Sequence, residues 1–146
     1  MSQSRPAALQ DLEREVGVLL RRIKHVIAER AACVHPELQA GAFHMLIWIA
    51  DKGPVRSTAL VDEFHVDKGA VSRTVQHLCE LGLLDRAPDP ADGRAVLVSA
   101  SPEAIRRLRE ANAQRRAWVQ ERLEGWSAAE LADLAERLER YNQALA

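Results

Sequence analysis

Apolar residues recur every three or four positions near both ends of this sequence. One run covers residues 9–26 and the other covers residues 131–145. This spacing places the apolar side chains on one face of a helix and is typical of a seam that packs against another helix. The second run follows Ser127 and Glu130, which have the spacing of a helix capping box. The pattern predicts a helix at each end of the chain, and the apolar face of each must pack against another helix.

Two more helices are predicted inside these ends. Phe43, Leu46 and Ile47 form an apolar face over residues 37–51, and the sequence Lys52-Gly53-Pro54 ends that helix. The residues Ser101-Pro102-Glu103 are a cap, a first-turn proline and a first-turn acid, so they begin a helix that runs to about residue 123.

The central region predicts a helix, a turn and a second helix, followed by a hairpin. A short helix covers residues 57–64, residues 65–66 form a turn, and Asp67 caps a longer helix that Gly82 ends. Residues 83–87 and 95–99 are predicted strands on either side of a stretch rich in proline and glycine. This order is that of a winged helix-turn-helix, whose second helix fits the major groove of B-DNA.

The predicted fold class is mainly α. A winged helix-turn-helix domain at residues 36–100, with a three-helix core and a β-hairpin wing, is flanked by helical regions at residues 1–35 and 101–146. The length of 146 residues suits one domain. Seven glycines, six prolines and 4% aromatic residues favour helices over a strand-rich fold.

The outward face of the second central helix carries donors and small residues. The cations at its start and middle can reach phosphates or guanine edges. The hydroxyl and amide groups can form hydrogen bonds with bases or with the DNA backbone, and the glycine lets the start of the helix approach the DNA closely. A soluble helix also needs a polar outer face, and this one has only two full positive charges. The candidate DNA-contacting residues are Lys68, Gly69, Ser72, Arg73 and Gln76.

The predicted wing presents a further arginine. The turn at residues 88–94 places Arg94 at the start of the return strand, where an arginine suits a narrow minor groove. Asp92 is positioned to orient that guanidinium, and Arg86 adds a cation on the outgoing strand. The alternative is an ordinary surface turn with an ion pair of little energetic value.

These segments together resemble the MarR family of bacterial winged helix-turn-helix regulators. The resemblance is carried by VDKGAVSR at residues 66–73, LCELGLL at residues 78–84 and DGRA at residues 92–95, where Asp92 and Arg94 form the family's DxR motif. The order of elements agrees over nearly the whole chain.

The resemblance implies a homodimer that binds double-stranded, pseudo-palindromic operator DNA and usually represses transcription. The first, fifth and sixth helices would form the dimer, so residues 1–35 and 101–146 become a dimerisation region and the two apolar seams become one interface. A small ligand, an oxidant or a metal relieves repression in such proteins. A phenolic or anionic effector is expected in a crevice for which Arg21, His44 and Trp48 are the candidates, although His44 and Trp48 also fit simple packing.

The charge balance provides no general attraction for DNA. The formal net charge is -1, and the middle third is slightly acidic, so any binding depends on local geometry. No apolar run approaches the roughly 18–20 residues that a membrane span needs, so we expect a cytoplasmic protein without a membrane partner.

Other functions remain as alternatives. Oxidation of Cys79 or Cys33 is a competing trigger, and a metal at Cys33, His35 and His44 lacks any fixing motif. We expect no cofactor and no enzyme activity, because no P-loop, GxGxxG, G-x-S-x-G or HExxH motif occurs. A winged helix used for protein contacts is the third possibility, and the neutral charge suits it.

Overall fold

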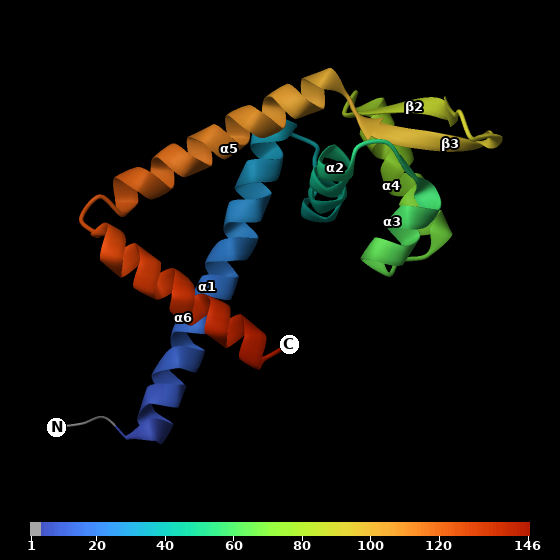
Figure 1. The fold of residues 1–146 in the computed structure, drawn as a ribbon. Helices are drawn as coiled ribbons and strands as arrows, with labels where there is room; N and C mark the ends of the chain where they lie inside the picture. Colours follow the sequence, from blue (N-terminus) through green and yellow to red (C-terminus); the bar gives the residue numbers. More distant parts are fainter. Residues whose placement is uncertain (1–3) are drawn as a thin grey trace. The chain divides into compact units, whose positions relative to one another are not determined.

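The computed structural model describes residues 4–146, and the described residues form six α-helices and three strands. The order is α1 (Arg5–Val34), α2 (Ala40–Lys52), β1 (Val55–Arg56), α3 (Ser57–Phe64), α4 (Lys68–Glu80), β2 (Leu84–Asp89), β3 (Asp92–Ala100), α5 (Pro102–Arg122) and α6 (Ala128–Ala144). Figure 1 shows this order along the chain. The chain divides into two compact units between Ala111 and Asn112, inside α5. The sequence instead predicted a DNA-binding domain at residues 36–100 between two helical dimerisation regions. That division concerns function and stays a prediction.

The first unit is built around one apolar core. Each helix from α2 to α4 contributes its inward stripe, the sheet contributes residues from β2 and β3, and the ends of α1 and α5 close the core. The largest fully buried side chains are Phe43, Leu46, Ile49, Leu60, Leu78, Leu83, Val34, Val71 and Val98. Burial of such side chains is the main favourable term in folding, so this core fixes α4 and the sheet as one body.

The helix boundaries follow local hydrogen bonding. α2 begins three residues later than the predicted residue 37, because residues 35–38 form a turn in which the His35 carbonyl accepts from the Leu38 N–H (3.0 Å) and the His35 Nδ1 accepts from the Glu37 N–H (3.1 Å). The cap of α4 is as predicted, with an Asp67 oxygen accepting from the Ala70 N–H at 2.8 Å. The backbone between α3 and α4 turns at His65, which has a φ of 51°.

The sheet is antiparallel with strand order β1-β3-β2, and it contains one strand that the sequence did not reveal. β1 has only two residues, and Val55 pairs with Val98 of β3. The wing is also longer than predicted, because β2 runs through Pro88 to Asp89 and β3 begins at Asp92. Proline is tolerated there because β2 is an edge strand, where a missing N–H leaves no ladder bond unmade.

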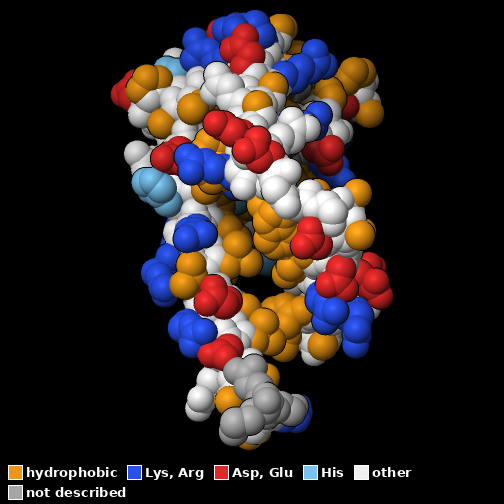
Figure 2. All heavy atoms as spheres, turned by 90° about the vertical axis from the view of Figure 1, so that its left-hand side faces the viewer, with side chains coloured by type: hydrophobic (Ala, Val, Ile, Leu, Met, Phe, Trp, Pro, Cys, Tyr) orange, Lys and Arg blue, Asp and Glu red, His pale blue; other side chains and the backbone are white. Residues whose placement is uncertain are grey.

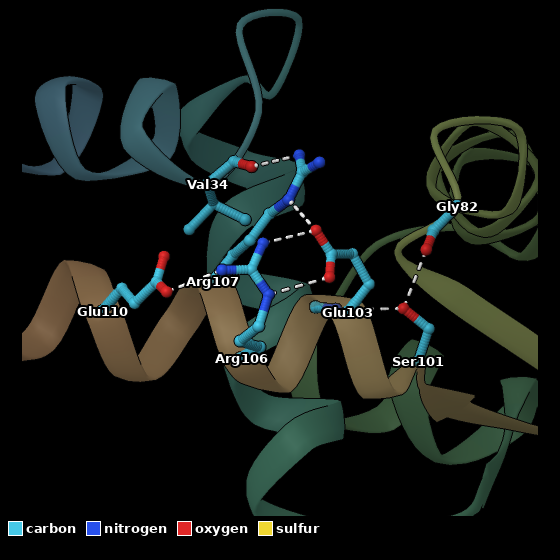
Figure 3. Close-up of polar contacts among 8 residues, drawn as sticks. Val34, Gly82, Ser101, Glu103, Arg106, Arg107 and Glu110 are labelled. Atoms are coloured by element: carbon cyan, nitrogen blue, oxygen red, sulfur yellow. Dashed lines mark hydrogen bonds and ion pairs between the residues drawn. The ribbon is translucent and has the colours of Figure 1, made fainter.

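Polar contacts join α5 to the rest of the first unit (Figure 3). The Ser101 hydroxyl donates to the Gly82 carbonyl at 2.7 Å and accepts from the Ala104 N–H at 3.1 Å, so Ser101 caps α5 as predicted and links it to the end of α4. Arg107 Nη1 donates to the Val34 carbonyl at the end of α1 at 2.9 Å. These contacts fix the start of α5 against both helices.

The second unit consists of the end of α5, a turn and α6. The predicted capping box is present, because the Ser127 hydroxyl accepts from the Glu130 N–H (3.3 Å) and the Glu130 carboxylate accepts from the Ser127 N–H (2.8 Å). Within α6 no residue is buried, and Leu131, Leu134 and Leu138 are about 40% exposed. Figure 2 shows hydrophobic side chains at the surface of the face it draws, interspersed with charged ones. An amphipathic helix with an uncovered apolar stripe is stable only when another surface covers it.

Candidate nucleic-acid interface

The two faces of α4 are those that the sequence predicted. Val71, Val75 and Leu78 are buried against the core and fix the rotation of the helix. The opposite face therefore points to solvent along the whole helix. The exposed residues on this face are Lys68, Gly69, Ser72, Arg73 and Gln76.

Gly69 leaves room for a folded arginine at the start of α4. A Cβ at this position would lie 3.1 Å from Asp67 Oδ1 and 3.3 Å from Arg73 Nη1, closer than ordinary van der Waals contact. Arg73 Nη1 therefore lies beside Gly69 in the first turn of α4, and the start of a helix favours phosphate. The effect of Gly69 is one of space, because its backbone φ is not in the left-handed region, and a larger residue would require Asp67 and Arg73 to shift slightly.

Gln76 and Arg86 contact each other rather than acting separately. Arg86 Nη1 of β2 donates to Gln76 Oε1 at 2.9 Å, and Gln76 Nε2 donates to Glu80 Oε1 at 2.9 Å. These bonds connect the middle of α4 to the outgoing strand of the wing. Their geometry favours a role in holding the two elements together, while Lys68 and Arg73 remain the exposed cations of the helix.

The wing turn places Arg94 at the exposed beginning of β3. The Asp92 carboxylate accepts from the main-chain N–H of Arg94 at 3.1 Å. The Asp92 carboxylate thus contacts the main chain of Arg94. The sequence had predicted a contact with the Arg94 guanidinium instead. Asp92 holds the turn, and the arginine side chain extends from an ordered base.

A partly buried ion pair that sequence reasoning missed supports this turn. Arg56 of β1 donates from Nε to Asp89 Oδ2 at 2.7 Å and also pairs through Nη2, while Asp89 Oδ1 accepts from the Ala91 N–H at 2.8 Å. The Asp89 side chain is only 9% exposed. The Ala91 hydrogen bond and the Arg56 guanidinium hold the pKa of Asp89 below its usual value.

The three effector candidates do not come together. His44 and Trp48 line one open cavity of about 560 Å³ between α2 and α3, together with Asp51 and Glu63. Arg21 lies on α1 and is not among the residues that line this cavity. His44 and Trp48 thus border the same cavity, and Arg21 is not part of its lining.

The two cysteines lie in different surroundings. Cys79 is partly buried at the end of α4, and burial raises the pKa of its thiol, although Arg86 acts in the opposite direction. Thiolates are the reactive form, so this site disfavours oxidation. Cys33 is exposed on α1. Within residues 4–146 no cluster of three His, Cys, Asp or Glu side chains is arranged to hold a metal ion.

Comparison with known proteins finds a family likeness over the central part of the chain. Residues 37–95 match the model of the MarR family. An uncharacterized HTH-type transcriptional regulator of Mycobacterium bovis is 36% identical over 78 residues, which are 53% of this chain and 54% of the relative. The HTH-type transcriptional repressor NicR of Pseudomonas putida is 33% identical over 91 residues, 60% of this chain and 57% of NicR. The chain thus spans a little over half the length of these curated relatives.

Solved structures share the fold over almost the whole chain. The crystal structure of Rv1404 from Mycobacterium tuberculosis has a TM-score of 0.81 and 22% identity, covering 99% of this chain and 96% of that one. A MarR variant from E. coli in complex with operator DNA has a TM-score of 0.63 and 21% identity, covering 95% of this chain and 99% of that one.

The fold and the exposed face of α4 define a winged helix-turn-helix protein. The match of residues 37–95 to the MarR family model agrees with the resemblance seen in the sequence. No helix in the described part of the chain is long and apolar enough to cross a membrane.

Proposed function

We propose that this chain is a transcription regulator that binds double-stranded DNA, acts as a homodimer on a pseudo-palindromic operator, and represses transcription. The observation that carries the proposal is the juxtaposition, on one packed unit, of the α4 face with Lys68 and Arg73 and a braced wing with Arg94. α4 is the element of the size that enters a major groove, and an arginine at a wing tip suits the adjacent minor groove.

The names of similar proteins support the same function. NicR is named as a transcriptional repressor, and the MarR variant was crystallised with operator DNA. Contacts to phosphate position such a protein and contacts to base edges give specificity. We assign Lys68 and Arg94 to backbone and minor-groove contacts, and Arg73 and Ser72 to the major groove. Gly69 allows the approach, and Gln76, Arg86 and Asp92 hold the contacting elements in place.

A second copy of the chain is the proposed cover for the apolar stripes. The stripe on α1 leaves Leu9, Leu12 and Leu19 more than 40% exposed, and the stripe on α6 is similarly uncovered. A two-fold axis would also set two copies of α4 about one turn of DNA apart, roughly 34–36 Å. Dimerisation therefore accounts for the exposed apolar side chains and predicts a palindromic target.

Fluorescence anisotropy tests the proposal. Purified protein is titrated onto labelled DNA from upstream of its own gene, with scrambled competitor DNA and with increasing salt. We expect saturation at two subunits per site. Arg94→Ala should weaken binding at least tenfold, and Arg73→Ala should cost roughly 1–3 kcal/mol for a base contact and relax specificity there.

Arg109→Ala is the matched control, because it removes one exposed cation from α5 outside the proposed interface. Lys52→Ala, which removes an exposed cation at the end of α2 and outside the proposed dimerisation region, is a second control. Losses for Arg109→Ala and Lys52→Ala equal to that for Arg94→Ala would contradict a specific role for the wing. Absence of binding to any fragment in a selection from total genomic DNA would overturn the proposal and favour a winged helix that contacts proteins.

We also propose that a small molecule releases the DNA and that it binds in the cavity lined by His44 and Trp48. The cavity is bounded by α3, which packs directly against α4. A ligand wedged between α2 and α3 would change the position of the recognition helix. An effector found by screening should lower the DNA affinity of the original chain but not that of a variant with a filled cavity.

A further inference from the structure

The cavity between α2 and α3 has an aromatic wall. Trp48 and Phe64 are half-buried, with ring centroids 6.2 Å apart and planes at 76°. The edge-to-face arrangement is one that aromatic pairs favour, so it gives the cavity a fixed side. The lining residues are Gly41, His44, Ile47, Trp48, Asp51, Glu63 and Phe64.

The charged groups of the lining are both acidic. Asp51 comes from α2 and Glu63 from α3, and the lining contains no lysine or arginine. Lys52 Nζ lies 3.8 Å from the Asp51 carboxylate, but both side chains are more than half exposed, which weakens that pair. Glu63 contributes a second negative charge from the other helix. Asp51 and Glu63 are both exposed, so solvent and salt screen their charges, and the sign of the remaining field favours a cation over an anion.

We propose that this cavity binds an organic cation with an aromatic or apolar body. An ammonium or similar group over the indole of Trp48 gains cation–π attraction, and the two carboxylates add to it. The apolar body of the ligand would contact Ile47 and Phe64. This ligand class is opposite in charge to the phenolic or anionic effector that the family resemblance implies.

This cation-binding proposal rests on the proposed function in one respect, because only a DNA-binding regulator would make the bound cation an effector. Binding of a cation to the cavity is measurable without DNA. Failure of DNA binding would therefore leave the ligand proposal intact, and failure of ligand binding would leave the DNA proposal intact.

Another tryptophan supplies an internal comparison. Trp118 on α5 is flanked by Arg115 and Arg122, whose guanidinium carbons lie 4.5 and 5.2 Å from the ring centroid. Cations already occupy the surroundings of this exposed indole. An added organic cation should therefore avoid Trp118 and prefer Trp48.

The test follows the indole N–H signals by two-dimensional NMR, with assignments from single Trp→Phe variants. Benzyltrimethylammonium is the probe, and its neutral carbon isostere neopentylbenzene and the anion phenylacetate are the controls. We expect a saturable shift of the Trp48 signal with the cation, and weaker or no shifts with the two controls. Equal or tighter binding of phenylacetate, or a cation response confined to Trp118, would overturn the proposal.

Two variants separate charge from space. Glu63→Gln keeps the shape of the side chain and should weaken binding of the cation about threefold to tenfold, while leaving any binding of the neutral isostere unchanged. Gly41→Leu adds a side chain where a Cβ meets no atom within 4 Å, so it should fill the cavity without strain. Replacing a helical glycine also favours the fold, so loss of binding there would not reflect unfolding. Unchanged affinity for the cation in both variants would contradict the site.

Discussion

Gly69 lies where Asp67 and Arg73 approach the first turn of α4. Gly69→Ala places a Cβ against Asp67 and Arg73, so the Arg73 guanidinium must shift slightly from its position beside Gly69. We expect DNA affinity to fall at least severalfold, with little change in melting temperature, because alanine is the better helix former. Anisotropy and thermal unfolding measure the two effects.

Gly41→Ala is the control for that prediction. Gly41 also lies in a helix, but a Cβ there meets nothing within 4 Å. Gly41 is the second residue of α2, so this variant should be at least as stable as the original chain and should keep its DNA affinity. Loss of DNA affinity in both variants would show that the effect of Gly69→Ala is not local.

Sequence patterns predicted individual residues best where they repeat. The 3-4 spacing of Val71, Val75 and Leu78 fixed which face of α4 is buried, and the exposed candidates followed from it. Arg56 and Asp89 could not be found in this way. They lie 33 positions apart in the sequence, and their pairing depends on a two-residue strand that is too short to show a period.

At the scale of elements, the Arg56–Asp89 pair is predicted to hold the wing in position for DNA. Asp89→Asn keeps an oxygen for the Ala91 N–H but removes the ion pair with Arg56. Removing a negative charge should by itself raise affinity for DNA. We expect the affinity to fall instead, by about threefold or more, because the turn that presents Arg94 loses its brace.

Asp85→Asn provides the same charge change on the same strand. Asp85 is exposed on β2, so its replacement should raise DNA affinity slightly through the electrostatic effect alone. Opposite signs for the two variants, measured by anisotropy at one salt concentration, support the brace. A rise in affinity in both would eliminate it.

The junction of α1 and α5 should be sensitive to acid through Glu103. Hydrogen bonds from Arg106 and Arg107 lower the pKa of Glu103 to about 2, from an ordinary value of 4.5. Because the folded-state pKa is the lower one, the stabilising contribution is present above about pH 4.5 and is lost as the pH falls towards 2. Arg107 in turn donates to the Val34 carbonyl, so protonation of Glu103 weakens a contact between helices.

Glu103→Gln tests this dependence. Denaturant unfolding should show the variant less stable than the original chain at pH 6, and the difference should shrink as the pH is lowered through this window. A difference that is the same at pH 6 and near pH 2 would show that the charge of Glu103 does not contribute.

At the scale of the whole molecule, the order of elements was predictable and the boundaries less so. Caps at Asp67 and Ser127 mark helix starts because their side chains bond backbone N–H groups within three residues. The start of α2 was misplaced because a histidine turn competes with the helix there. The full length of the wing was not predicted, because Pro88 was expected to end the strand. Proline is compatible with β2 because β2 is an edge strand. The acidic lining of the α2–α3 cavity could not be predicted from the sequence, because Asp51 lies on one helix and Glu63 on the other.

The homodimer is predicted to depend on the α6 stripe. Leu134→Asp places a charge at a side chain that is 41% exposed in the single chain and covered in the proposed dimer. We expect the dimer to dissociate in analytical ultracentrifugation and operator affinity to fall sharply. Ala132→Asp, on the opposite face of α6, should leave both unchanged. A stable dimer with Leu134→Asp would place the interface elsewhere.

Hydroxyl-radical footprinting on a selected operator tests the central claim most directly, because it records where the protein lies on DNA. Two recognition helices related by a two-fold axis should protect two regions centred about 10–10.5 base pairs, or a multiple of that, apart. Flanking minor-groove protection should disappear in Arg94→Ala. A single protected region, uniform protection of all sequences, or a footprint unaffected by Arg94→Ala would contradict a dimeric winged-helix regulator.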